Sequence, residues 1–391
     1  MRTRSVSTRR LLAMLGLGLG LVLGPTARAG EPPSAVAADV VVTVLHDRAL
    51  SPAQHRLRLD RQHLQDRPDD LTLALQVAHQ ALALARQGGD SRYLAQVIAA
   101  LTPWWSRADA PEPVRLVRAT VRQTQHDFDA ALDELKDLTQ VAPTNAQAWW
   151  TLATLYQLQG QYGPAAQACA GLRASGATWQ ADVCRYELLS FQGQAPEARA
   201  GLARLMWRAP SALRAHLVLL RAELAQRLGE HEEATQLFDT LAEIAQDPYS
   251  ESALADWWLD QGRADQVWQR LQGRTRHDGL LLRLTEAAVA LRRPEAPGLV
   301  ALLTQRLLTA RHRGEHSIHW REEARFQLHV LKQPRRALPL ALKNWSIQKE
   351  PIDARLLLEA ARAAGRPQDA QPMLDFVRAA GWTDVRLGVG S

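Results

Sequence analysis

The residues that could carry out chemistry in this chain are few, and the densest group is a histidine-rich stretch. His312, Glu315, His316 and His319 fall within the sequence RHRGEHSIHW. Spacings of four and three residues would align the imidazoles on one face of a single helix, and histidine is a common ligand of zinc and copper. Gly314 interrupts such a helix. The sequence therefore favours a polar loop and leaves a metal site at His312, His316 and His319 as the second interpretation.

The remaining polar residues form no recognisable catalytic motif. Adjacent carboxylates such as Asp69 and Asp70 are typical of a solvated helix face rather than of a general acid–base pair. The sequence contains no glycine-rich phosphate loop, no nucleophile elbow and no His-Glu-x-x-His zinc helix. We therefore predict that the chain is not an enzyme and that it has no cofactor.

The N-terminus has the features of a secretory signal. Four arginines among the first ten residues precede an apolar run over residues 11–23, and Ala27–Ala29 form a small-x-small cleavage site. An uncleaved anchor is the alternative, but the run falls short of the roughly 20 residues that span a bilayer. We predict a signal peptide over residues 1–29, a periplasmic or secreted mature chain and no transmembrane segment in it.

The charge of the chain gives no reason to expect nucleic acid as a partner. The formal net charge is +6, but five arginines and no acidic residue lie in residues 1–29. The rest of the chain is therefore close to neutral. Its charge is uneven, since residues 306–349, here called the basic segment, hold ten Lys or Arg against three Glu.

A helix-turn-helix pattern with a period near 34 residues covers most of the chain. In the clearest unit, residues 146–177, Ala153 and Ala165 allow two antiparallel helices to cross closely, and Gly160 lets the chain turn between them. Neighbouring units repeat this spacing, which predicts five helix pairs over residues 112–275. Each pair leaves an apolar face bare, so the pairs must stack to be stable.

The pattern is weaker on both sides of this block. Residues 67–111 resemble a degenerate first helix pair, and residues 276–391 further degenerate pairs that contain the basic segment and a C-terminal cap. Residues 30–66 are expected to be a helical or disordered lead segment, because one isolated strand would leave its backbone groups unpaired. The predicted fold class is therefore all-α.

Cys169 and Cys184 are the only cysteines. They fall on the second helix of one predicted pair and on the first helix of the next, which pack against each other. An even number of cysteines in an exported protein is typical of a disulfide. The alternative is two buried thiols, because cysteine also behaves as a small apolar residue.

The unit at residues 146–177 closely resembles the tetratricopeptide repeat. The residues at that family's characteristic positions are Trp149, Leu152, Ala153, Tyr156, Gly160, Tyr162, Ala165, Cys169 and Leu172. The resemblance implies an α-solenoid of antiparallel helix pairs forming a right-handed superhelix, and a protein or peptide partner held in its concave groove. The style of the signal points to an exported bacterial member of this family.

The resemblance also implies that a ligand lies against the first helices of successive repeats. The corresponding positions are Thr120, Gln123, Trp150, Thr154, Gln157, Val183, Glu187, Glu223, Gln226, Arg227 and Asp256. The family's clamp for a terminal carboxylate needs Lys, Arg and Asn at such places, whereas Thr, Glu and Asp stand at several of them here. A neutral or basic segment is therefore favoured over a terminal carboxylate.

The sequence thus predicts an exported scaffold or adaptor that binds a protein or peptide partner, in the assembly or maintenance of a cell-envelope complex. The alternative is a metal-handling or carbohydrate-binding accessory protein that uses the histidine-rich stretch or the 12 tryptophans. For most of these tryptophans packing between helix pairs is the favoured role, and Trp150 is the exception that we expect to face the groove.

Overall fold

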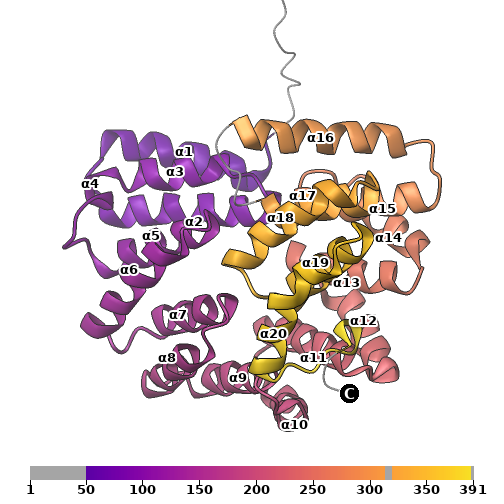
Figure 1. The fold of residues 1–391 in the computed structure, drawn as a ribbon. Coiled ribbons are helices and arrows are strands. Elements are labelled where there is room, and N and C mark those ends of the chain that lie inside the picture. The colour runs from indigo at the N-terminus through magenta and orange to yellow at the C-terminus, as the bar shows by residue number, and fades with distance from the viewer. Residues whose placement is uncertain (1–49, 313–318, 389–391) are drawn as a thin grey trace, which may run out of the picture. The chain divides into compact units, whose positions relative to one another are not determined.

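Helices make up the regular structure of residues 50–312 and 319–388, which the computed structural model describes, and these ranges contain no β-strand (Figure 1). The chain is an all-α solenoid of stacked helix pairs. Residues 50–391 form one compact unit. The predicted signal peptide, and residues 30–49 of the predicted lead segment, lie outside the described residues.

Five helix pairs occupy the region of strongest repeat pattern. They are α5 (Glu112–Thr124) with α6 (Phe128–Val141), α7 (Ala146–Leu158) with α8 (Tyr162–Ala174), α9 (Thr178–Leu189) with α10 (Ala195–Leu205), α11 (Arg214–Leu228) with α12 (His231–Ile244), and α13 (Pro248–Asp260) with α14 (Ala264–Leu271). The two helices of each pair pack on each other. Two short 3-10 turns, η1 (Met206–Arg208) and η2 (Ser211–Leu213), connect α10 to α11.

Further helices lie on both sides of this block. Those before it are α1 (Pro52–Asp66), α2 (Leu71–Gly88), α3 (Arg92–Ala100) and α4 (Thr102–Trp105). Those after it are α15 (Asp278–Ala290), α16 (Ala296–His312), α17 (Trp320–Arg325) with its π-helical continuation η4 (Phe326–Val330), α18 (Pro334–Ile347), α19 (Pro351–Ala363), η5 (Pro367–Ala370), α20 (Gln371–Ala380) and η6 (Val385–Leu387). Helix α1 lies in the predicted lead segment and packs on α2, which pairs with α3.

The turns inside the pairs require a left-handed backbone. Gly160, Gly193, Gly229 and Gly262 have φ between 71° and 76°, a region that glycine enters without steric cost. In the α5–α6 pair His126 takes the same place with φ of 59°, which is uncommon for a residue with a side chain. The pair is otherwise regular, so the turn geometry is set by the repeat and not by glycine alone.

A helix glycine makes room for the aromatic residue of its own repeat. A Cβ atom on Gly171 of α8 would lie 2.5 Å from the ring of Trp149, on α7. The ring cannot easily move away, because Trp149 Nε1 donates a hydrogen bond to the backbone oxygen of Pro143 at 2.9 Å. Gly163, in the same helix, has no atom within 4 Å of the equivalent position.

These two glycines provide a matched test of the packing. We expect Gly171→Ala to lower the free energy of unfolding by about 1–3 kcal/mol through overpacking. Gly163→Ala should leave it unchanged or raise it by up to about 1 kcal/mol, because alanine is the better helix former. Urea denaturation followed by circular dichroism measures both. Equal effects of the two substitutions would contradict the close approach of Trp149.

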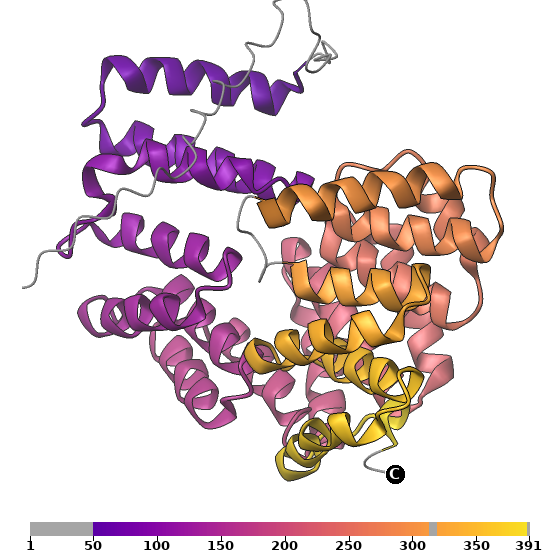
Figure 2. The same ribbon diagram turned by 45° about the horizontal axis from the view of Figure 1, so that its top comes forward.

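The C-terminal helices return to the central repeats and pack along their intra-repeat turns. In Figures 1 and 2 the yellow C-terminal helices lie beside the magenta central ones. The contacts follow the order of the turns: Gln348 meets His126, Phe376 meets Gly160, Gly381 meets Gly193 and Val385 meets Gly229. A backbone hydrogen bond of 2.7 Å from Lys349 N to Leu158 O joins the same two regions. The C-terminal segment therefore holds four successive repeats together along one edge.

An aromatic cluster forms the centre of this contact. Trp382 is 2% exposed, and its Nε1 donates a hydrogen bond of 2.8 Å to the hydroxyl of Tyr162. Its ring centroid lies 5.3 Å from that of Phe191 and 6.0 Å from that of Phe376. One hydrophobic core thus joins repeats over residues 119–191 to residues 324–387. This contact goes beyond the C-terminal cap that the sequence predicts.

Candidate partner-binding face

The predicted groove positions lie on the first helices of five successive pairs. Thr120 and Gln123 are on α5; Trp150, Thr154 and Gln157 on α7; Val183 and Glu187 on α9; Glu223, Gln226 and Arg227 on α11; and Asp256 on α13. The structure brings some of these side chains together and commits others to internal contacts.

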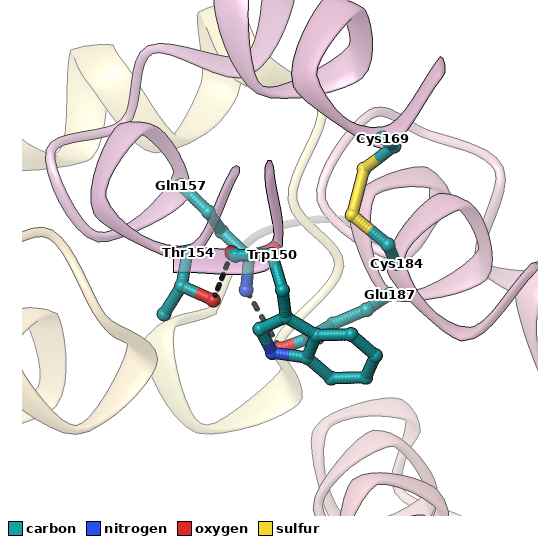
Figure 3. Close-up of a disulfide and its surroundings, with 6 residues drawn as sticks. All are labelled: Trp150, Thr154, Gln157, Cys169, Cys184 and Glu187. Carbon is teal, nitrogen blue, oxygen red and sulfur yellow. Dashed lines mark hydrogen bonds between the residues drawn. A yellow bond between two sulfur atoms is a disulfide. The ribbon is translucent and has the colours of Figure 1, made fainter. Parts of the chain in front are cut away.

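Trp150, Gln157 and Glu187 form the best-defined part of the face (Figure 3). The indole of Trp150 is half-buried and lies 6.4 Å, centroid to centroid, from the ring of His216 on α11. Gln157 Nε2 donates a hydrogen bond of 2.7 Å to Glu187 Oε1. Thr154 is exposed, and its hydroxyl donates to the backbone oxygen of Trp150. His216 was not expected at this face, because it falls outside the repeat positions from which the groove is predicted.

Carboxylates gather where α9 and α11 approach the start of α19. Burial and the negative charges of Glu350 and Glu187 raise the pKa of Glu223 to about 8, and the positive charge of Arg227 offsets only part of this. Burial likewise raises the pKa of Glu187. Tyr249, at the start of α13, is 56% exposed, and the charge of Glu223 is the largest cause that raises its pKa. This region therefore becomes more negative as the pH rises and these carboxyl groups ionise.

The members of this acidic group differ in their partners. Arg321 of α17 pairs with Glu350 and donates a hydrogen bond of 2.6 Å to Asp353. Glu187 accepts from Gln157. Among the described residues, the carboxyl of Glu223 has neither a hydrogen bond nor an ion pair. A cation could form an ion pair with Glu223 without displacing an existing partner.

Other predicted groove positions serve the structure itself. Arg227 is 4% exposed, donates to Ser190 Oγ at 2.8 Å and lies over the ring of Phe191. Asp256 pairs with Arg283 and Arg325, which lower its pKa although burial works to raise it. These two side chains are not available to a ligand in this conformation.

The remaining predicted positions differ in exposure and in bonding. Thr120 and Gln123 are half-buried, and Thr120 Oγ1 donates to the backbone oxygen of Leu116. Gln226 donates to Asp260. Val183 is fully buried, so the expectation that it faces the groove is wrong. It packs in a cluster with Leu217 and Leu224 of α11, because the next helix pair covers that part of α9.

We define the inner face by the six side chains that line the region around Glu223 and Trp150. They are Trp150, Gln157, Glu187, His216, Glu223 and Tyr249. They come from four helices that are separate in the sequence, and they combine aromatic surface with two carboxyl groups of raised pKa. This combination suits a segment that carries positive charge.

The sulfur atoms of Cys169 and Cys184 are joined in a disulfide that links α8 to α9 (Figure 3). The two Cα atoms are 5.8 Å apart, and both side chains are buried. The bond connects adjacent repeats directly beside Glu187 on the same helix. It thereby fixes α9 relative to α8 at the edge of the inner face.

The histidine-rich stretch lies partly outside the described residues. His312 is the last residue of α16, and His319 is the N-cap of α17. His316 and Glu315 are not described, so the metal interpretation stays a prediction. Within residues 50–312 and 319–388, no group of three His, Cys, Asp or Glu side chains has an arrangement that could hold a metal ion.

The basic segment is not a uniformly positive surface, because acidic residues from other helices neutralise part of it. Arg306 pairs with Asp278, Arg325 with Glu286, and Arg321 with Asp353. Arg335 and Arg336 on α18 are exposed. Arg335 borders an open pocket of about 480 Å³ that Leu338, Pro339, Leu342 and Arg366 also line.

Residues 123–183 match the family model described as Tetratricopeptide repeat. This range runs from the end of α5 into α9, and similar helix pairs continue on both sides of it. The fold places the chain in the class of helical-repeat scaffolds, in which short units stack into a solenoid. Residues 123–183 are therefore similar to the tetratricopeptide repeat, which generally serves as a non-catalytic scaffold for protein interactions.

Two solved structures show a distant likeness to the chain. The human IFIT1 dimer with m7Gppp-AAAA is 14% identical, with 88% of this chain and 92% of that chain covered and a TM-score of 0.37. The TPR domain of P58(IPK) is also 14% identical, with 81% and 94% covered and a TM-score of 0.21. Neither likeness carries an argument about function. The search of curated proteins gave no match.

None of the helices in residues 50–312 and 319–388 has the length and apolar character that crossing a bilayer requires.

Proposed function

We propose that the chain is an exported adaptor that holds a neutral or basic segment of a protein partner against the inner face. In this proposal it acts in the assembly or maintenance of a cell-envelope complex. The tetratricopeptide repeats support a protein partner, and the signal-like N-terminus supports export. The observation that carries the charge preference is Glu223, an ionisable group with a raised pKa and no partner among the described residues.

The inner face offers two kinds of contact to such a segment. Trp150 and the exposed ring of Tyr249 present aromatic surface, which attracts both apolar side chains and cations. Glu223 can pair with a lysine or arginine side chain. Because such a cation favours the ionised carboxylate, binding must be accompanied by loss of the Glu223 proton at neutral pH.

Affinity for a basic peptide should consequently rise with pH. Below about pH 8 Glu223 is largely protonated in the free protein. The affinity of residues 50–391 for a lysine-rich model peptide should increase by up to about tenfold per pH unit between pH 6 and 8, then level off. Isothermal titration calorimetry measures this. Glu223→Gln should weaken binding at pH 8 and make the affinity depend less on pH. The other charged and titratable groups at this site are Glu187, Glu350, His216, Arg227 and Arg386, and they account for any pH dependence that is left.

The same group predicts a pH effect on the free protein. The pKa of Glu223 is higher in the folded than in the unfolded chain, so its contribution to stability falls as pH rises from about 4 towards 8. Above pH 8 we expect Glu223→Gln to be more stable than the parent by about 1–3 kcal/mol, because water screens part of the burial cost. Equal stability of the two proteins at every pH would contradict the raised pKa.

A second comparison locates the site. Trp150→Ala should reduce peptide affinity by about 2 kcal/mol, as for a desolvated aromatic anchor. The reversal of charge at Arg335 and Arg336 should leave it unchanged. Loss of binding in the arginine variant alone would move the site to α18 and contradict the inner-face assignment. Trp150 also packs against two hydrophobic cores, so the melting temperature of each variant must be measured alongside.

Export has its own test. N-terminal sequencing of the protein from the envelope fraction should find a chain that begins at Gly30. An intact Met1 terminus in the cytoplasm would contradict export and leave the scaffold role untouched.

A further inference from the structure

The most exposed large apolar side chain in the described residues is Trp207, which is 92% exposed. It is the middle residue of η1, in the connection between α10 and α11. Its neighbours Leu205 and Met206 are half-buried and pack against the hydrophobic cores beneath. The turn is thus anchored on both of these residues while the indole projects into solvent. Full exposure of a tryptophan forfeits a large burial gain, which calls for an explanation.

Arginines flank Trp207 in the sequence on both sides. Between Glu197 and Glu223 the sequence contains five arginines and no acidic residue. Two of them, Arg199 and Arg221, pair with Glu233. The other three, Arg204, Arg208 and Arg214, are exposed and form no ion pair among the described residues. We call Trp207 with these three arginines the Trp207 tip.

We propose that the Trp207 tip docks on an anionic lipid surface. Tryptophan favours the boundary between the hydrocarbon and the headgroups of a bilayer, because its ring is apolar and its N–H remains polar. Exposed arginines beside it are attracted to anionic headgroups. The charge complementarity therefore selects a negative surface over a neutral one.

The shape of the tip favours a membrane over an acidic protein. A protein partner would need a concave pocket that matches a single projecting indole, whereas a lipid interface accepts a projecting ring without a preformed pocket. The tip also lies on a connection between repeats. The C-terminal helices cover the turns within repeats, at the opposite ends of the helices. Docking would therefore leave that contact undisturbed.

Vesicle binding tests the proposal. The protein to be tested is the compact unit of residues 50–391, which contains its own hydrophobic cores. It lacks the apolar run near the N-terminus, because that run could itself bind lipid. We expect this unit to sediment with vesicles of phosphatidylglycerol and phosphatidylethanolamine, and not with pure phosphatidylcholine. Binding should weaken as salt is added. Trp207→Ala, and separately the double charge reversal R204E/R208E, should each lower the partition coefficient by about tenfold.

The controls distinguish insertion of the Trp207 ring into the bilayer from electrostatic attraction by arginines elsewhere on the surface. Trp207→Phe should retain most of the binding, and charge reversal at Arg335 and Arg336 should not reduce it. Quenching by lipids with brominated acyl chains should be present in the parent and absent in Trp207→Phe, which assigns the signal to Trp207. Unchanged circular dichroism spectra exclude misfolding of the variants.

Three results would overturn the proposal: no sedimentation of the parent with anionic vesicles, binding that Trp207→Ala does not reduce, or binding to a polyglutamate peptide in place of vesicles. None of these outcomes affects the inner face, whose test uses a different ligand and different variants.

Discussion

Replacing Trp382 with alanine should lower the free energy of unfolding by about 3–5 kcal/mol, the range measured for large aromatic residues in packed cores. The side chain is 2% exposed and packs against Phe191 and Phe376. Its loss leaves a cavity at the contact between the C-terminal segment and the central repeats. It also removes the hydrogen-bond donor to the buried hydroxyl of Tyr162, which costs further stability.

The effect should be accompanied by a local change. Hydrogen exchange should become faster over residues 345–388 in Trp382→Ala, because these residues lose the side chain that ties them to α8 and α9. Trp207→Ala is the matched control, since it removes the same side chain from a position that is 92% exposed and should alter stability by less than about 0.5 kcal/mol. Similar losses in the two variants would contradict the described C-terminal packing.

Removal of the disulfide should produce the second large effect. Cys169 and Cys184 are separated by 15 residues, and closing a loop of this size lowers the entropy of the unfolded chain enough to stabilise the fold by about 3 kcal/mol. We expect the double substitution Cys169→Ala and Cys184→Ala to lose about this much in urea denaturation. Adding dithiothreitol should destabilise the parent protein and leave the variant unchanged.

Mass spectrometry gives the direct measurement for this bond. Peptides of the non-reduced protein, isolated from the envelope fraction, should contain Cys169 linked to Cys184. Two thiols that can be alkylated without reduction would contradict the bond and support the alternative of two buried free cysteines. The result also bears on localisation, because a stable disulfide is typical of an oxidising compartment.

The repeats could be predicted from the sequence because the residues that define each helix pair lie close together in the chain. Ala153 and Ala165 are 3% and 0% exposed at the helix crossing, and Gly160 has the left-handed backbone that its turn requires. Each of these follows from the contacts inside one helix pair, which recur every few tens of residues. The all-α class follows from the same period.

The C-terminal contact could not be predicted in this way. Tyr162 and Trp382 are 220 residues apart, and nothing in the local pattern of either residue identifies the other. Both read as ordinary packing aromatics within their own units. Arg227 shows the same limit at the inner face: the motif places it towards the groove, whereas its guanidinium turns to Ser190 and Phe191 of the preceding pair.

The candidate site was predictable in part for a similar reason. Trp150, Gln157, Glu187 and Glu223 are identified through the resemblance to the tetratricopeptide repeat, which implies that a ligand lies against the first helices. Their electrostatic character depends on Glu350, which belongs to a distant helix. The absence of a partner for Glu223 therefore becomes visible only when the described residues are placed together.

The contact between the C-terminal segment and the central repeats restrains the solenoid. A repeat array joined only by neighbours behaves as a spring, whose pitch and curvature can vary over its length. Here residues 376–385 contact the turns that follow α7, α9 and α11, so spreading of these repeats would separate the C-terminal segment from Gly160, Gly193 and Gly229. A partner would bind to a surface of nearly fixed width, and the repeats would lose little conformational entropy on binding. We expect such a surface to favour ligands that already match its width.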